Sequence, residues 1–139
     1  MDNSVSLPYA ALTVLAILAG IQDWRKREVT DWLTWPLFLC GVISAIVSAS
    51  RLDLLPLIVS IFFLITWYFD WMGGADVRVL VGLWGVWPLA GFLAILVTGL
   101  WGLILIMRKR GKERIPALVT IAFGTCLTFL LEVAKMKTY

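Results

Sequence analysis

Histidine is absent from the 139-residue chain, and cysteine occurs only as Cys40 and Cys126. The two cysteines lie in separate apolar runs and form no Cys-x-x-Cys motif. Because protein zinc sites are built mainly from histidine and cysteine, we expect no metal site and no cofactor. The lack of histidine also excludes Ser-His and Cys-His catalysis. Acid-base chemistry in this chain would therefore rest on carboxylates.

Charge is scarce as well. Charged residues make up 15% of the chain and hydrophobic residues 61%, and the mean hydropathy is +0.93. A soluble domain of this length is far less apolar. No polar stretch exceeds about ten residues, so a separate soluble domain is not expected. The composition predicts an all-α, multi-pass membrane protein with a single domain over residues 1–139.

Six apolar segments are predicted to be transmembrane helices: 7–21, 32–49, 54–71, 77–87, 89–107 and 115–133. The run 77–107 would measure about 46 Å as one helix, against a hydrocarbon core of roughly 30 Å. Proline inside a helix removes a hydrogen bond and clashes with the preceding turn, so we place a break at Trp87-Pro88. The fourth span is therefore short.

Six spans place both termini on one side of the membrane. Nine of the twelve basic residues fall in loops of the opposite side: Arg25, Lys26, Arg27, Arg78, Arg108, Lys109, Arg110, Lys112 and Arg114. By the positive-inside rule these loops face the cytoplasm, so both termini are expected on the non-cytoplasmic side of the cell membrane. Basic residues at membrane edges suit anionic lipid headgroups, and the net charge of +3 calls for no nucleic-acid partner.

The segment 72–78, Met-Gly-Gly-Ala-Asp-Val-Arg, places a carboxylate, Asp76, between two apolar runs. An ionisable side chain within a lipid-buried helix costs about 2.5–3.5 kcal/mol at the bilayer centre, so Asp76 is a functional candidate. Gly73 and Gly74 lack a Cβ, and so they allow a turn or the close approach of another chain. The alternative is that Asp76 only caps the helix that begins at Val77.

Asp23 ends the first span and is expected at the same membrane depth as Asp76. Two carboxylates held together do not both ionise easily, so one keeps a proton and the other is a base near neutral pH. Such a pair can activate water and protonate a leaving amide nitrogen, which is the chemistry of an aspartic protease. The alternative is that Asp23 faces the headgroups or pairs with Arg25 or Arg27.

Three segments resemble one family. Segment 73–80, Gly-Gly-Ala-Asp-Val-Arg-Val-Leu, is similar to the Gly-x-Gly-Asp motif of type IV prepilin peptidases, which is typically followed by Val-Lys-Leu-Leu. Segment 23–31 resembles the family's other aspartate, with its basic stretch and the start of the next span. Segment 113–118, Glu-Arg-Ile-Pro-Ala-Leu, followed by Gly124, is similar to a Lys-Ile-Pro-Phe segment near the family's C-terminus.

The resemblance implies a six-span aspartic endopeptidase of a prokaryotic cell membrane. Such an enzyme clips the short basic leader from prepilin-like or archaellin precursors at the cytoplasmic face. It makes Asp23 and Asp76 the catalytic pair, with Gly73, Gly74 and Ala75 as the supporting motif. Ala75 stands where bacterial members usually have glycine, and Thr30-Asp31 replaces Pro-Asn. The N-methyltransferase region of larger bacterial enzymes is missing, so the chain resembles the short, peptidase-only form and no methyl transfer is expected.

Three further carboxylates are candidates for binding the basic leader. Asp70 could support Asp76 or bind the leader, or it could be an interfacial charge. Glu28 and Asp31 could attract the leader, or they could be solvated surface charges. Two alternative functions remain open: an inactive or repurposed homologue, for which Ala75 is the warning sign, and a small transporter with a broken helix.

Overall fold

The computed structural model describes residues 6–26, 29–108 and 117–137. These residues form six helices and no strand: α1 (Ser6–Lys26), α2 (Asp31–Ser50), α3 (Leu55–Tyr68), α4 (Gly74–Val86), α5 (Pro88–Met107) and α6 (Ala117–Lys137). The all-α prediction is confirmed. The largest shift from the predicted boundaries is at the end of α1, which continues through the polar residues to Lys26. Arg25 and Lys26 in the last turn suit the negative end of the helix dipole.

Four segments are long and apolar enough to cross a membrane: Leu7–Lys26, Asp31–Ser50, Pro88–Met107 and Ala117–Lys135. The protein is therefore a multi-pass membrane protein. α3 is apolar but has only 14 residues. α4 has 13 residues, and at 1.5 Å per residue it measures about 20 Å, less than the roughly 30 Å of the hydrocarbon core. The count of six complete spans stays a prediction.

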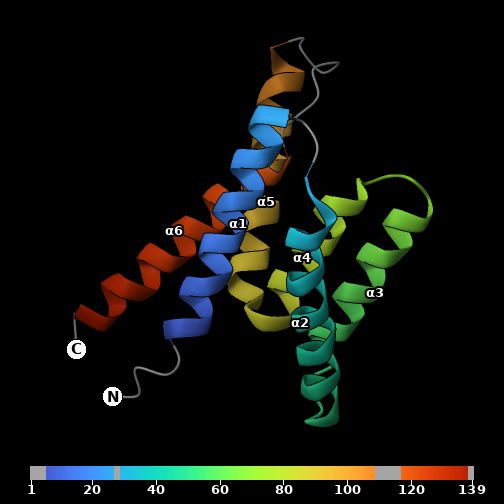
Figure 1. Ribbon diagram of the computed structural model, residues 1–139, viewed down its shortest axis with the longest axis vertical. Helices are drawn as coiled ribbons and strands as arrows, with labels where there is room; N and C mark the ends of the chain where they lie inside the picture. Colours follow the sequence, from blue (N-terminus) through green and yellow to red (C-terminus); the bar gives the residue numbers. More distant parts are fainter. Residues whose placement is uncertain (1–5, 27–28, 109–116, 138–139) are drawn as a thin grey trace.

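The helices pack as two groups (Figure 1). In the α1 group, α6 lies between α1 and α5, and in the α2 group, α4 packs along α2 and α3. The groups are joined at Trp87, which ends α4, has a non-helical backbone (φ −142°, ψ 79°) and is followed directly by Pro88 of α5. The predicted break at Trp87-Pro88 is confirmed. Near the start of α1, Tyr9 stacks on Trp87 with ring centroids 4.5 Å apart.

Glycines bring the backbones of α2 and α4 into contact. A Cβ added to Gly82 would lie 2.7 Å from the carbonyl oxygen of Leu37, and one added to Gly85 would collide with the carbonyl group of Gly41. Small residues at such a seam let two helices approach closely. The successive positions Val79, Leu80 and Val81 of α4 are all buried, although they face different directions. α4 is therefore surrounded by protein.

The helices run alternately up and down, so the end of α1 and the starts of α2 and α4 lie at one end of the molecule (Figure 1). The start of α1 and the end of α6 lie at the other end. Asp23 lies three residues before the end of α1 and Asp76 two residues after the start of α4, so these residues, 53 positions apart in the sequence, lie at the same end. Which end faces the cytoplasm stays a prediction of the charge distribution.

Candidate active site

Asp76 lies inside the first turn of α4. Gly73 has an extended backbone (φ −63°, ψ 141°) and is the N-cap, so the helix begins at Gly74. The alternative that Asp76 caps a helix beginning at Val77 is therefore wrong, because the helix starts three residues earlier than that reading requires. Gly73 has no side chain with which to cap the helix. The Asp76 carboxylate stands in the turn as an acidic group near the positive end of the helix.

The glycines before Asp76 leave space for side chains. A Cβ added to Gly73 would lie 3.1 Å from Oδ2 of Asp76, and one added to Gly74 would lie 3.1 Å from Nε1 of Trp67. Among the described residues no glycine has a positive φ, so neither position needs the left-handed conformation. Ala75 is partly buried and packs against the hydrophobic core. This part of the motif therefore serves packing around the carboxylate.

Asp23 is bound by the first turn of α6. The backbone N–H of Leu118 donates a hydrogen bond to Oδ2 of Asp23 at 3.3 Å. The first N–H groups of a helix lack partners within the helix, and they carry a partial positive charge that favours a carboxylate ion. The sequence alternative paired Asp23 with a nearby arginine, whereas in the structure this carboxylate is engaged by α6. Arg27 lies outside the described residues.

The two aspartates interact electrostatically. Burial, and then the nearby carboxylate of Asp23, raise the pKa of Asp76 from 3.8 to about 6. Asp76 precedes the apolar part of α4, a helix too short to cross the bilayer alone. Both causes disfavour the charged form, so Asp76 keeps its proton up to about pH 6. The structure thus brings together the two residues that the sequence singled out.

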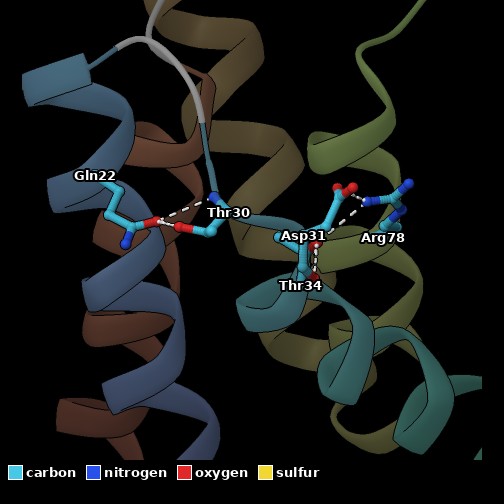
Figure 2. Close-up of polar contacts among 5 residues, drawn as sticks. All are labelled: Gln22, Thr30, Asp31, Thr34 and Arg78. Atoms are coloured by element: carbon cyan, nitrogen blue, oxygen red, sulfur yellow. Dashed lines mark hydrogen bonds and ion pairs between the residues drawn. The ribbon is translucent and has the colours of Figure 1, made fainter.

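Asp31 has an intramolecular partner. Arg78 forms an ion pair with Asp31, and its Nη1 also lies 3.5 Å from Oγ1 of Thr34 (Figure 2). The guanidinium group stands over the ring of Trp35, 4.9 Å from its centroid. The side chain of Arg78 is 19% exposed and that of Asp31 is 73% exposed. Asp31 is therefore engaged by Arg78, and its role in binding a basic leader stays a prediction.

Of the other candidate carboxylates, the structure describes Asp70. Asp70 is exposed, in the turn after α3, and has a left-handed backbone with φ 55°. Glu28 lies outside the described residues. Near the end of α6, Glu132 and Lys135 form an ion pair, with the charged atoms 3.6 Å apart.

Gln22 was not singled out by the sequence. Its side-chain oxygen accepts hydrogen bonds from the backbone N–H of Thr30 at 3.1 Å and from the Thr30 hydroxyl at 2.8 Å (Figure 2). Thr30 is the N-cap of α2, but its hydroxyl makes no capping bond. No local pattern indicates a contact across eight residues. We call Gln22, Thr30, Asp31, Thr34 and Arg78 the α2 bridge.

An apolar groove of about 420 Å³ lies between α1 and α6. Its lining comes from one face of α1 and from the start of α6: Ile17, Gly20, Ile21, Trp24, Arg25, Val119 and Ala122. Gly20, one of the lining residues, is three positions before Asp23. In the part of the chain that the structure describes, no three metal-ligating side chains cluster, and the expected absence of a metal stays a prediction.

Comparison with known proteins gave one finding. A model of the type IV leader peptidase family matches residues 10–131. The matched region contains Asp23, Asp76 and the start of α6, which are the elements of the site described above. No curated protein and no solved structure matched the chain. Because the family model covers most of the sequence, this chain belongs to the type IV leader peptidase family.

Proposed function

We propose that the protein is an aspartic endopeptidase that removes the short basic leader from prepilin-like precursors, such as prepilins or archaellins, at the cytoplasmic face of a prokaryotic membrane. The observation that carries the proposal is that Asp23, in the last turns of α1, and Asp76, in the first turn of α4, lie at one end of the molecule, where Asp23 contributes to the raised pKa of Asp76. Two aspartates from separate helices, placed to influence each other in a chain of this family, are what aspartic catalysis requires.

In the proposed mechanism the two carboxylates have different roles. Asp23, held by the N–H of Leu118, is the base that accepts a proton from the attacking water. The water oxygen bonds to the carbonyl carbon of the scissile peptide. Asp76, which keeps its proton because it is partly buried, donates it as the carbon–nitrogen bond breaks and the amine leaves. Neither a metal nor a covalent enzyme intermediate is needed.

The proposed substrate presents a basic leader followed by an apolar helix. Asp70 is exposed at the turn before the Gly73 motif and is our candidate for binding the leader, together with Glu28. Asp31 could attract the leader only in competition with Arg78. The apolar groove beside Asp23 offers a surface for the apolar segment. Methyl transfer to the cleaved product is not part of the proposal.

Co-expression with a leader-bearing substrate tests the proposal. Asp23→Asn and Asp76→Asn should each reduce processing by about 10³-fold or more, because each removes a group that moves a proton in the reaction. Cleavage is measured by mass spectrometry of the substrate N-terminus. Asp53→Asn is the matched control, since Asp53 is exposed in the turn between α2 and α3. The proposal is wrong if both Asn variants process the substrate as well as the parent does.

The same assay addresses the alternative of an inactive or repurposed homologue. If the parent cleaves none of several leader types but the Ala75→Gly variant does, that alternative is favoured. The transporter alternative gains no support from the first half of the chain, because α1, α2 and α3 each run without a break. An inverted repeat would need an interruption there to match the one at Trp87.

A further inference from the structure

The start of α2 is bound on two sides by the helices that carry the aspartates (Figure 2). On one side Gln22 of α1 accepts two hydrogen bonds from Thr30. On the other side Arg78 of α4 pairs with Asp31 and reaches toward Thr34, which is fully buried. The α2 bridge thus connects α1 to α4 through the first turn of a third helix.

The contacts of Arg78 indicate which way Asp76 faces. Residues two apart on an α-helix point about 200° from each other, because each residue turns the helix by about 100°. Arg78 points toward α2, where Asp31, Thr34 and the Trp35 ring receive it. Asp76 therefore points away from α2, to the side on which the charge of Asp23 acts on it. If α4 rotated about its axis, Asp76 would leave Asp23.

On α1, the contacts of Gln22 likewise indicate which way Asp23 faces. The two residues are adjacent, so their side chains point about 100° apart. Gln22 faces Thr30 at the start of α2, while Asp23 faces the N–H of Leu118 at the start of α6. The hydrogen bonds of Gln22 and Asp23 therefore fix both the rotation of α1 and its distance from α2.

The direct contact between α1 and the α2 group is small. α1 packs mainly on α6 and only slightly on α2, while α4 packs mainly on α2 and also contacts α5 and α6. The stacking of Tyr9 on Trp87 lies near the other end of α1. The separation of the two aspartates is thus a separation between two helix groups, and the α2 bridge is the polar link across it.

We propose that Arg78 is a positioning residue: through Asp31 and Thr34 it fixes the rotation of α4 so that Asp76 faces Asp23, while Gln22 and Thr30 hold α1 in register. The relevance of this inference to catalysis rests on the proposed function, but the placement of Asp76 can be measured without it. The contacts of Arg78 are with α2 and not with the carboxylates of Asp23 and Asp76, so Arg78 acts through the position of α4.

The first experiment measures proximity. Asp23→Cys and Asp76→Cys are combined with Cys40→Ser and Cys126→Ser, and a short bifunctional thiol reagent is applied to membranes. Adding Arg78→Gln should lower the cross-linking yield severalfold, whereas Arg78→Lys, which keeps a charge for Asp31, should lower it less. Glu132→Gln, which removes an ion pair near the end of α6, is the control and should have no effect. An unchanged yield with Arg78→Gln overturns the inference.

The second experiment uses the catalytic rate. Arg78→Gln should lower kcat by about 10-fold to 100-fold with KM nearly unchanged, since a shift of about 1 Å in a reacting group can cost 10²-fold. Asp31→Asn should act similarly, and the double variant should be no worse than Arg78→Gln, because both changes break one link. Additive losses, or a rise in KM alone, overturn the inference.

Two controls separate this inference from folding and from the proposed function. If Arg78→Gln does not fold, as judged by size exclusion in detergent, then Gln22→Leu tests the other side of the α2 bridge and should also reduce cross-linking. If Arg78→Gln reduces cross-linking but Asp23→Asn leaves processing intact, the positioning role stands and the proposed function fails. If Asp23→Asn abolishes processing while Arg78→Gln changes neither readout, only the positioning role fails.

Discussion

Asp23 and Asp76 have the same type of side chain, but their surroundings differ. Asp23 accepts an N–H from the start of α6, an environment that stabilises negative charge. Asp76 is partly buried, and it lies in the field of Asp23, so its pKa is raised to about 6. The surroundings of Asp76 thus favour its protonated form. In the proposed mechanism, the different surroundings of the two carboxyl groups divide the roles of acid and base between them.

The pH dependence of Asp76 can be followed with a carbodiimide, which reacts with protonated carboxyl groups. Burial and Asp23 both favour the protonated form, so labelling of Asp76 should be strong below pH 6 and fall as the pH rises through about 6. Asp23→Asn removes a negative charge and should move the midpoint to lower pH. Mass spectrometry of the labelled peptide measures both effects. Asp53→Asn should leave the midpoint in place, and an unmoved midpoint in Asp23→Asn would contradict the pairing.

At the scale of elements, α4 positions the site. It is too short to cross the hydrocarbon core, and successive residues on different faces of it are buried. It is held against α2 by backbone contact at Gly41, Gly82 and Gly85 along the helices and by the Arg78–Asp31 ion pair at their start. The glycine seam sets the distance between the two helices, and in our proposal the ion pair fixes the rotation of α4 at its start. Packing along the whole length of α4 therefore holds its first turn, and with it Asp76, in place.

Gly82→Ala should separate α2 from α4. The new Cβ would lie 2.7 Å from the Leu37 carbonyl oxygen and 2.9 Å from its carbon, and both are backbone atoms that cannot move aside cheaply. We expect a loss of about 1–3 kcal/mol in the free energy of unfolding, as for other overpacked sites. Thermal unfolding in detergent, followed by tryptophan fluorescence, measures it as a lower Tm.

Gly99→Ala is the matched control for this seam, because no atom lies within 4 Å of its added Cβ. Alanine favours helix more than glycine does, so this variant should be as stable as the parent or slightly more stable. Equal Tm values for the two alanine variants would show that the seam tolerates a methyl group.

At the scale of the whole molecule, the site lies where two helix groups meet. Asp23 belongs to the α1 group and Asp76 to the α2 group, with the start of α2 linked to both. Any movement of one group against the other changes the distance between the carboxylates. The break at Trp87-Pro88 passes the chain from one group to the other, and it lies at the end of α4 farther from Asp76.

The predicted orientation can be tested with reporter fusions. By the positive-inside rule, alkaline phosphatase fused after Arg108 should be inactive because it stays in the cytoplasm. A fusion after Arg51, in the turn between α2 and α3, should be active outside. A green fluorescent protein fused at the same two sites should give the opposite pattern and controls for expression. Activity of the phosphatase after Arg108 would reverse the assigned face of the site.

Some of this arrangement could be predicted from the sequence because it depends on local properties. Apolar runs predict helices wherever they occur, and Pro88 breaks a helix whatever surrounds it. Successive spans alternate in direction across the membrane. The end of the first span and the start of the fourth therefore lie on the same side, which places Asp23 and Asp76 at one end of the molecule. The rarity of carboxylates at membrane edges then singled out both residues.

Only the tertiary structure decided how these residues meet. α4 begins at Gly74, before Asp76, and the side chains of Asp76 and Trp67 lie close to Gly73 and Gly74. Asp31, predicted as a possible leader site, pairs with Arg78, 47 residues away. Such contacts depend on how each helix is rotated about its axis and on which helix packs beside it. The hydropathy pattern and the spacing of residues predict neither of these. The sequence by itself therefore determined the helices and the end at which the acids lie, and packing determined that the two acids interact.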